Sequence, residues 1–317
     1  MMLLAFMALF AGNVFAEPRV VVVNREDATI TVLRVQGASL RPLKTIAVGK
    51  TPREMCLAPD GKRVYVSNGD GNSISAVDLT KLEVVATITH PKLIFPEGCG
   101  VSPDGGEVWI TSARGNCALV VETASNTITR EIATGATPRR VMFNADGSTV
   151  FISNAKGNTV SVIDRKSGKV SKTLPMGHEP RQMTLSPDGK QLLVGNIEDD
   201  TIAFVDVKTL ATEKVLGVTP SPQRMVYSKT GDMIYVLGRL RGELGFVSLR
   251  ASGEFRRMIH SMPLMPSPWS MALSADGDFL YITSNGDDRI SVLDLRLMKI
   301  AGTATAGKDL GDIVYVP

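Results

Sequence analysis

Residues Pro180–Asp206 read PRQMTLSPDGKQLLVGNIEDDTIAFVD. A short apolar segment, Gln182–Leu185, leads into the turn sequence Ser186–Gly189. In such a turn proline presets φ, aspartate bonds its own backbone, and glycine adopts the left-handed conformation that closes a hairpin. Leu192–Val194 is again apolar, and Ile202–Asp206 shows the period-two alternation of a strand. The stretch therefore predicts three strands, of which the first two are joined by a tight turn.

This turn recurs at regular intervals along the chain. Counterparts of Ser186–Gly189 are Ala58–Gly61, Ser102–Gly105, Asn144–Gly147, Ser228–Gly231 and Ser274–Gly277. The final glycines of successive turns are 44, 42, 42, 42 and 46 residues apart. A period of about 42 residues with about four strands per unit is the sequence signature of a β-propeller.

The two ends of the chain each carry part of one unit. Arg19–Asn24 resembles the second strand Arg63–Asn68, and Thr29–Leu33 resembles the third strand Ser73–Val77. The first strand that this N-terminal unit lacks is supplied by Gly307–Pro317. Six complete units and one shared unit predict an all-β, seven-bladed β-propeller with four-stranded antiparallel blades, the last blade being closed by both termini.

The N-terminal segment Met1–Ala16 is apolar and contains no charged residue. Val14-Phe15-Ala16 before Glu17 fits the small-residue rule for signal-peptide cleavage, although no Lys or Arg precedes the apolar run. A buried or membrane-anchoring segment is the alternative, but 16 residues are marginal for a membrane span. We expect a signal peptide at residues 1–16, one propeller domain at 17–317, and a periplasmic or secreted protein that is not integral to the membrane after cleavage.

Composition and motifs exclude several classes of function. The net charge of +3, without a basic stripe interleaved with aromatics, gives no case for nucleic-acid binding. The patterns C-x-x-C, H-E-x-x-H and G-x-S-x-G do not occur, so no common metal or nucleophile motif is present. The sequence names no cofactor, and we expect a monomer.

The three cysteines do not form a disulfide framework. Cys56 and Cys99 lie on the first strands of neighbouring units, and Cys117 opens a third strand. We expect all three to be small buried hydrophobic residues, in preference to a disulfide or a metal site.

The second strands carry a recognisable consensus. They read VYVSN at 64–68, VFISN at 150–154, LLVGN at 192–196 and LYITS at 280–284. With the Pro-Arg openings and the SPDG turns, these segments resemble the YVTN-repeat family of β-propellers, within a lactonase-like superfamily of surface-layer and exported proteins. The resemblance covers nearly all of residues 17–317. It implies the fold, whereas relatives include lactonases, quinone- and haem-associated periplasmic proteins, and proteins without assigned activity.

One ring of residues is expected to line the mouth of the central channel. It consists of the residues that follow the proline position at the start of each first strand: Arg53, Glu97, Arg139, Arg181, Gln223, Trp269 and Gly311. The repeated arginine either bonds to neighbouring blades as part of the scaffold or forms an electropositive funnel for a carboxylate or phosphate. Trp269 either stacks on a ring-bearing ligand or packs across the channel.

Two loops that lead into first strands are expected to be longer than the rest, Thr89–Glu97 and Ile259–Trp269. Around the second loop lie thioether and imidazole groups that suit copper(I), unless they simply fill an irregular loop. These candidate ligands are Met258, His260, Met262 and Met265. His178 lies at the same rim, where it is either an axial ligand, a base or a solvated side chain.

These features favour an exported, non-enzymatic binding or scaffold propeller. It would present the face that carries the ring to a protein partner or a small anionic ligand. The alternative is a lactonase-type hydrolase, in which the rim arginines, Glu97 and His178 polarise an ester carbonyl and position water. A further alternative is a periplasmic accessory to a quinone, haem or copper system.

Overall fold

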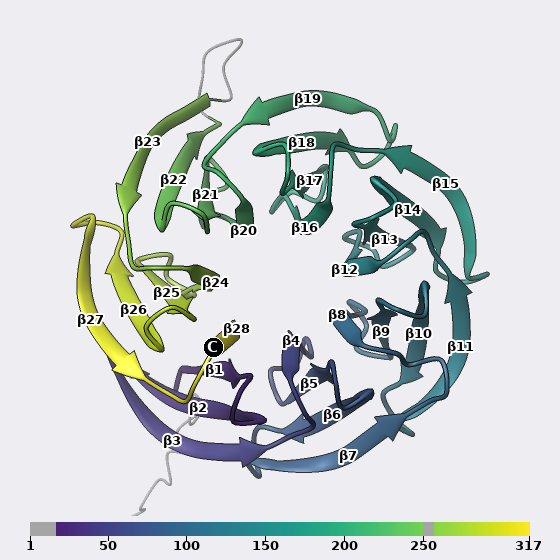
Figure 1. Ribbon diagram of the computed structural model, residues 1–317, viewed down its shortest axis with the longest axis horizontal. Helices are drawn as coiled ribbons and strands as arrows, with labels where there is room; N and C mark the ends of the chain where they lie inside the picture. Colours follow the sequence, from purple (N-terminus) through teal and green to yellow (C-terminus); the bar gives the residue numbers. More distant parts are fainter. Residues whose placement is uncertain (1–16, 250–256) are drawn as a thin grey trace, which may run out of the picture.

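Seven four-stranded antiparallel sheets are arranged radially around one axis (Figure 1). This architecture comes from a computed structural model that describes residues 17–249 and 257–317. The predicted fold class is confirmed. The expected signal peptide, residues 1–16, lies outside the described residues. Within the described ranges, no helix has the length and apolar character needed to cross a membrane.

Each blade runs from an innermost strand to an outermost one. The innermost strands of blades 1 to 7 are β28 (Leu310–Val316), β4 (Pro52–Leu57), β8 (Pro96–Val101), β12 (Pro138–Phe143), β16 (Pro180–Leu185), β20 (Pro222–Tyr227) and β24 (Pro268–Leu273). The second strands are β1 (Arg19–Asn24), β5 (Arg63–Asn68), β9 (Glu107–Ser112), β13 (Thr149–Asn154), β17 (Gln191–Asn196), β21 (Met233–Gly238) and β25 (Phe279–Ser284). The third strands are β2 (Thr29–Gln36), β6 (Ser73–Asp78), β10 (Cys117–Glu122), β14 (Thr159–Asp164), β18 (Thr201–Asp206), β22 (Glu243–Ser248) and β26 (Arg289–Asp294). The outermost strands are β3 (Ser39–Ala47), β7 (Glu83–Thr89), β11 (Thr127–Ala133), β15 (Lys169–Pro175), β19 (Thr212–Gly217), β23 (Arg257–Pro263) and β27 (Lys299–Thr305).

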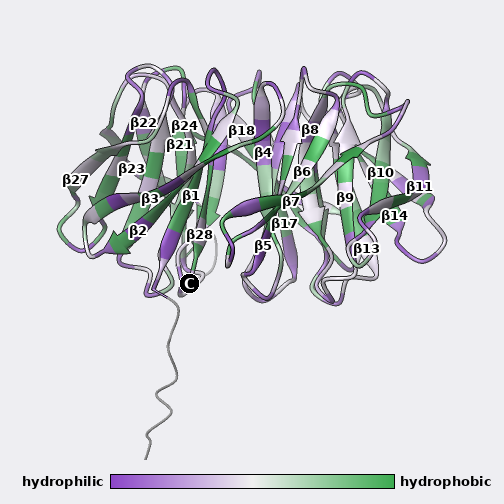
Figure 2. Cartoon of the chain, turned by 90° about the horizontal axis from the view of Figure 1, so that it is seen from below, coloured by the Kyte–Doolittle hydropathy of each residue, from purple (hydrophilic) through white to green (hydrophobic). Residues whose placement is uncertain are grey.

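The turn between the innermost and second strands forms as its sequence predicts. In blade 5, the Ser186 hydroxyl donates to Asp188 Oδ1 at 2.6 Å, and the Gly189 N–H donates to the Ser186 carbonyl at 2.8 Å. Gly189 has a φ of 71°, the left-handed value that favours glycine. These turns and the C-terminus lie on one side of the ring, which we call the lower face (Figure 2). The loops that lead into the innermost strands lie on the other side, the upper face.

Second strands are buried on both sides, because each blade packs against a neighbour on either face. Val20–Val23 of β1 are fully buried, which explains why β1 is a continuous apolar run without alternation. In outermost strands such as β7, by contrast, exposed and partly buried residues alternate. The core therefore consists of apolar layers between neighbouring blades, as in the layer that joins Tyr65 and Ile74 of blade 2 to Ile110 of blade 3.

The S-N pair that ends several second strands has a structural explanation. Asn68 Nδ2 donates to the hydroxyls of Ser73 and Ser75 on the next strand at 3.1 and 3.0 Å. The Ser67 hydroxyl donates instead to the carbonyl of Glu97 in blade 3. Equivalent bonds from Thr111, Ser153 and Thr283 join three other pairs of neighbouring blades. The positions without a hydroxyl are Val23, Gly195 and Leu237.

The termini close the ring as predicted. β28 pairs antiparallel with β1, with Arg19 opposite Val316 and Val21 opposite Val314. Leu310 and Ile313 of β28 are fully buried in the layer between blades 7 and 1. Blade 1 therefore combines one strand from the C-terminal end of the chain with three from the N-terminal end (Figure 1).

Two expectations are corrected by the structure. In the second long loop, residues 259–263 belong to strand β23 and residues 268–269 to β24. Only residues 264–267 connect the two strands, so only residues 90–95 form a longer upper-face loop. Cys56 and Cys99 form a disulfide between blades 2 and 3, with Cα atoms 5.7 Å apart. The two cysteines lie on adjacent innermost strands, β4 and β8, at positions that differ by one residue in the repeat. Cys117 is free and buried, as expected.

Candidate functional site

The residues at the channel mouth are positioned by a backbone conformation that recurs in the loop before each innermost strand. The residue before the proline position has a positive φ in all seven blades: Thr51, Phe95, Thr137, Glu179, Ser221, Ser267 and Asp309. In five blades the N–H of this residue donates to an Asn or Asp of the preceding blade, as from Glu179 to Asn158 Oδ1 at 3.1 Å. Each preceding blade thus fixes where the next innermost strand begins.

A β-bulge then brings two consecutive residues of an innermost strand to the channel. The register of β4 against β5 shifts between Pro52 and Met55, and comparable shifts occur in β8, β12, β16, β20 and β24. A bulge places two residues of one strand opposite one of its partner. Both Arg53 and Glu54 consequently line the same pocket. The channel therefore carries two stacked rings of side chains.

The upper ring is the one predicted from the sequence. Glu97 lies between two guanidinium groups: Arg53 donates to Glu97 Oε1 at 3.1 Å, and Arg139 forms an ion pair with the same oxygen. The side chain of Glu97 is only 5% exposed. Burial alone would raise the pKa of this carboxyl, but the charges of Arg53 and Arg139 overcome that effect and hold its pKa below the usual value. We call these three residues the mouth triad.

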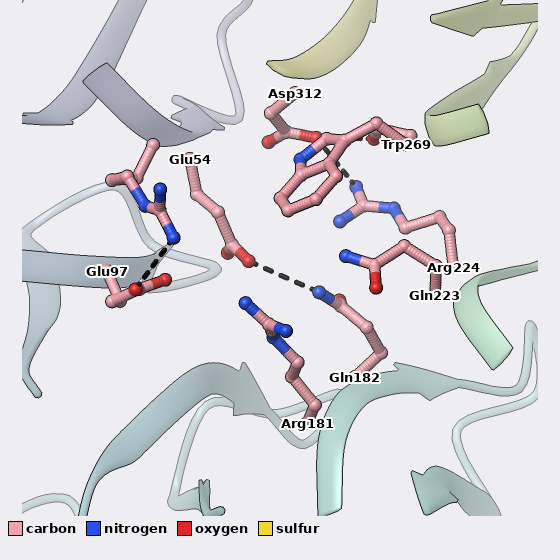
Figure 3. Close-up of a pocket in the computed structure, with 10 residues that line it drawn as sticks. Glu54, Glu97, Arg181, Gln182, Gln223, Arg224, Trp269 and Asp312 are labelled. Atoms are coloured by element: carbon pink, nitrogen blue, oxygen red, sulfur yellow. Dashed lines mark hydrogen bonds and ion pairs between the residues drawn. The ribbon is translucent and has the colours of Figure 1, made fainter. Parts of the chain in front are cut away.

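Arg181 adds positive charge without a close carboxylate of its own. Its nearest carboxylate contact among the described residues is Glu179, at 3.9 Å. Burial, and then the charge of Arg139, lower the pKa of Arg181. Two of the three predicted rim arginines are thus engaged by one carboxylate, and the third keeps donors that point into the pocket (Figure 3).

Trp269 is covered by arginines. The guanidinium of Arg25 lies 4.2 Å from the indole centroid and that of Arg239 lies 4.7 Å away, both within range of cation–π attraction. Arg25 also forms an ion pair with Asp309. Burial is the first cause that lowers the pKa of Arg25, and Asp309 partly opposes it. The indole therefore serves as a platform for cations in this structure.

The lower ring was missed by the sequence analysis. Its members are Glu54, Gly98, Arg140, Gln182, Arg224, Ser270 and Asp312. Arg140 donates to Glu54 Oε2 at 2.6 Å. Gln182 donates to Glu54 Oε1 at a longer 3.3 Å (Figure 3). Asp312 is 2% exposed and accepts from the Ser270 hydroxyl at 2.6 Å and from the Met55 N–H at 3.0 Å.

Arg224 is the least satisfied cation of the lower ring. Its nearest carboxylate oxygen among the described residues is that of Asp312, at 3.6 Å, beyond a good hydrogen bond. Burial, followed by the charge of Arg140, lowers the pKa of Arg224. The sequence signal for this ring was the run of charged residues inside strands whose remaining residues are apolar.

The space enclosed between the two rings is small. It is lined by Arg53, Glu54, Arg181, Gln182 and Arg224, among others, and has room for about one water molecule. This space therefore does not admit a ligand larger than a water molecule.

His178 lies at the upper face, as expected, but it does not line the central pocket. Its Nδ1 is 2.7 Å from Asp199 Oδ1, and its imidazole is well exposed. The hydrogen bond from His178 to Asp199, followed by the charge of Asp199, raises the pKa of the imidazole. Whether this pair acts as a base or is only a solvated dyad stays a prediction.

The candidate copper ligands lie on the outside of blade 6 rather than at the mouth. Met258, His260 and Met262 belong to the outermost strand β23, and the His260 ring stacks on Phe246 at 5.8 Å. Met262 and Met265 pack against the apolar layer between blades 6 and 7. In the part of the chain that the structure describes, no group of three or more His, Cys, Asp or Glu side chains is arranged to hold a metal. The copper site stays a prediction.

Comparison with known families agrees with the repeat. Residues 60–146 and 142–240 match the family model described as a YNCE-like beta-propeller. Residues 16–83 match the model described as lactonase, 7-bladed beta-propeller. None of the curated proteins matches the chain in sequence.

Solved structures share the fold at low sequence identity. The periplasmic gluconolactonase PpgL of Pseudomonas aeruginosa is 17% identical, with a TM-score of 0.80 over 95% of this chain and 99% of that one. A putative 6-phosphogluconolactonase from Bacteroides uniformis is 15% identical, with a TM-score of 0.80 over 95% and 100% of the two chains. Hydrazine synthase of Kuenenia stuttgartiensis is 20% identical, with a TM-score of 0.74 over 83% and 89%.

These matches correct the function expected from the sequence. A non-enzymatic binding or scaffold protein was favoured there, whereas the lactonase family model, with the gluconolactonase and the putative 6-phosphogluconolactonase among the similar structures, favours the alternative, a lactonase-type hydrolase. The structural likeness by itself shows only the fold at these identities. The resemblance to YVTN-repeat propellers is confirmed. Because the YNCE-like family model matches more than half of the 317 residues of this chain, the chain belongs to the YNCE-like beta-propeller family.

Proposed function

We propose that the protein is a lactone hydrolase whose substrate binds at the channel mouth on the upper face. The family match to seven-bladed lactonases supports this proposal, as do the two lactonases among the similar structures. A lactone is a cyclic ester, so its hydrolysis needs a group that polarises the carbonyl, a water molecule, and a base that removes a proton from that water.

The observation that carries the proposal is the meeting of these three requirements in one pocket. The guanidinium of Arg181 points into it, the carboxylate of Glu54 lines it, and between the rings there is room for about one water molecule (Figure 3). Glu97 is a poor base because two guanidinium groups hold its pKa low. Glu54 is better placed, since its Oε1 accepts only the long hydrogen bond from Gln182.

These positions define a reaction sequence. The lactone carbonyl oxygen lies against Arg181, whose positive charge stabilises the oxyanion that forms when water adds to the carbonyl carbon. Glu54 takes the proton of the attacking water and then delivers it to the ring oxygen as the carbon–oxygen bond breaks. The product is an open-chain hydroxy acid, which releases the remaining proton of the water to solvent and becomes a carboxylate with one negative charge.

The charge at the mouth favours a substrate or product with negative charge. Five arginines, Arg25, Arg53, Arg139, Arg181 and Arg239, surround Trp269 and the upper ring. Among the described residues, the carboxylates that pair with them are Glu97, Asp309 and, at 3.9 Å from Arg181, Glu179. This excess of guanidinium groups supports the small anionic ligand expected from the sequence, because converging positive charges attract anions to a narrow opening.

Export and a monomeric state complete the proposal. The Cys56–Cys99 disulfide supports a periplasmic or secreted location, since disulfides persist in oxidising compartments. A closed ring leaves no unpaired inner edge at the joint between the termini, which supports a monomer.

The test is direct measurement of lactone hydrolysis. Purified protein is assayed in a pH-stat with glucono-1,5-lactone and 6-phosphogluconolactone, with spontaneous hydrolysis subtracted. Arg181→Gln and Glu54→Gln are each expected to lower kcat at least ~100-fold, as for loss of an oxyanion donor or a general base. Arg296→Gln, at a side chain that is 63% exposed, is the matched control and is expected to leave the rate unchanged. Rates equal to the spontaneous reaction with every lactone would overturn the proposal.

A further inference from the structure

The innermost strand of blade 3, β8, is fixed on both of its sides. Toward blade 4, a Cβ on Gly98 would lie 1.9 Å from the carbonyl oxygen of Arg139, and a Cβ on Gly100 would lie 3.1 Å from Val141. These glycines let β8 approach β12 where no side chain fits. Toward blade 2, Cys99 is bonded to Cys56. The strand is thus held between its neighbours, and we call Gly98, Gly100 and the Cys56–Cys99 disulfide the clamp.

The clamp lies directly beneath the mouth triad. Cys56 follows Arg53 by three residues on β4, and Cys99 follows Glu97 by two residues on β8. Gly98 lies against the carbonyl of Arg139 itself. Each member of the triad therefore stands on a strand that the clamp holds, at a distance of no more than three residues from it.

No ladder of backbone hydrogen bonds holds β4 and β8 together. Innermost strands pair only with the second strand of their own blade, so β4 and β8 belong to different sheets. Near the mouth, noncovalent bonds between blades 2 and 3 run from the Ser67 hydroxyl of β5 to the Glu97 carbonyl and from the Phe95 N–H to Asn72 Oδ1. The disulfide is the covalent tie, and without it the separation of Arg53 from Glu97 depends on side-chain contacts alone.

The opposite sector of the ring is built differently. At the boundaries of blade 6 with blades 5 and 7, the hydroxyl position of the second strand is occupied by Gly195 and Leu237, which cannot donate. The mouth residues there are Gln223 and Trp269. The tightest fixation thus coincides with the sector that carries the triad.

We propose that Cys56 and Cys99 are a positioning pair, whose disulfide holds Arg53 and Arg139 against the Glu97 carboxylate, and that its reduction loosens this triad. The positioning itself does not depend on the chemistry at the mouth. Its consequence for turnover, a weaker hold on a lactone substrate, rests on the proposed function.

A small dithiol can reach the bond. The disulfide lines a cavity of about 420 Å³ that includes the turn residues Pro103 and Asn144 of the lower face. A thiolate of dithiothreitol attacks one sulfur and forms a mixed disulfide, and its second thiol then closes a six-membered disulfide ring. The protein gains two electrons and two protons as two cysteine thiols, and the reductant is oxidised.

The first test follows the Glu97 carboxyl by ¹³C NMR titration of the folded protein with and without dithiothreitol. In the oxidised protein its pKa is low because of Arg53 and Arg139, against the effect of burial. After reduction the guanidinium groups recede while burial remains, so the pKa is expected to rise. Glu107, which pairs with Arg130 and Arg165 in blades 3 and 4, is the control and is expected to titrate unchanged. An unchanged Glu97 titration, or an equal rise at both carboxyls, would overturn the proposal.

The second test uses variants and turnover. Cys56→Ser with Cys99→Ser is expected to raise KM for glucono-1,5-lactone about fivefold with kcat retained, whereas Cys117→Ala is the control with KM unchanged. In an Arg53→Gln background the double serine change is expected to raise KM no further, because the triad is already broken. The same fold-rise in both backgrounds would contradict positioning through the triad. If no lactone is hydrolysed, the proposed function fails while the NMR titration still decides the positioning.

Discussion

The carboxylate of Glu97 accepts a hydrogen bond from Arg53 of blade 2 at 3.1 Å and pairs with Arg139 of blade 4 through the same oxygen. One acidic side chain of blade 3 therefore joins three blades at the channel mouth. Because it is buried with two cations, its loss leaves like charges facing each other without compensation.

Replacing Glu97 by glutamine is expected to lower the free energy of unfolding by about 3 kcal/mol at neutral pH. The lowered folded-state pKa gives a stabilisation that is present above the unfolded value of about 4.3 and is lost as the pH falls through the folded pKa. Chemical denaturation at pH 7 and pH 3 checks this. The difference in the free energy of unfolding between wild type and variant is expected to be smaller at pH 3 than at pH 7. An equal difference at both pH values would contradict the ion-pair explanation.

A methyl group on Gly98 tests the close approach of β8 to β12. Gly98→Ala places a carbon against the Arg139 carbonyl, where 1.9 Å is available, and is expected to destabilise the protein by about 1–3 kcal/mol. Gly217→Ala is the control, because nothing lies within 4 Å of a Cβ at that position, and its effect is expected to stay within about 0.5 kcal/mol. Thermal melts of the two variants make the comparison, and equal melting temperatures would refute the tight contact.

Deletion of residues 307–317 tests the closure of blade 1. It removes Leu310, Ile313 and Val316, each 7% exposed or less, at about 1.5–3 kcal/mol per buried side chain. The shortened protein is expected to be unfolded or to melt far below the full chain. Deletion of the exposed Pro317 alone is the control, with no expected change. A shortened protein that melts with the full chain would show that the ring closes in another way.

The His178–Asp199 pair predicts a pH-dependent local charge. Asp199 raises the pKa of His178, so the contribution of this pair to stability is present below the unfolded value of about 6.5 and is lost as the pH rises through the folded pKa. Asp199→Asn is expected to lower the imidazole pKa in an NMR titration. Glu198→Gln is expected to have a smaller effect, because Glu198 acts only through its charge. A larger shift from Glu198→Gln than from Asp199→Asn would contradict this assignment.

The sequence predicted the ring and its upper layer of side chains because both follow from the repeat. The glycine turns set the period, and Arg53, Glu97 and Trp269 occupy one repeat position that lies at the channel mouth. The predicted strand closure also follows from the repeat, since Gly307–Pro317 matches the one strand that the first blade lacks.

The lower layer escaped prediction because period-two alternation assigns neighbouring residues to opposite sides of a strand. The bulge after each proline position removes that alternation, so that Glu54 joins Arg53 at the channel. The Cys56–Cys99 bond depends on the distance between two sheets, which repeat spacing does not give. In β23, methionine, histidine and proline obscured the strand pattern, and its residues 259–263 were therefore predicted as loop.

The pairing of Arg19 with Val316 has a consequence for how the protein folds as it is synthesised. Blades 2 to 7 each draw their four strands from one contiguous stretch, so each can assemble soon after it leaves the ribosome. The first strand to emerge must instead wait for the last, with its inner edge unpaired in the meantime. Contacts between residues so distant in sequence form slowly, and exposed strand edges promote aggregation. Closure of blade 1 therefore waits for β28, and until that strand is made the unpaired edge of β1 is exposed to misassembly.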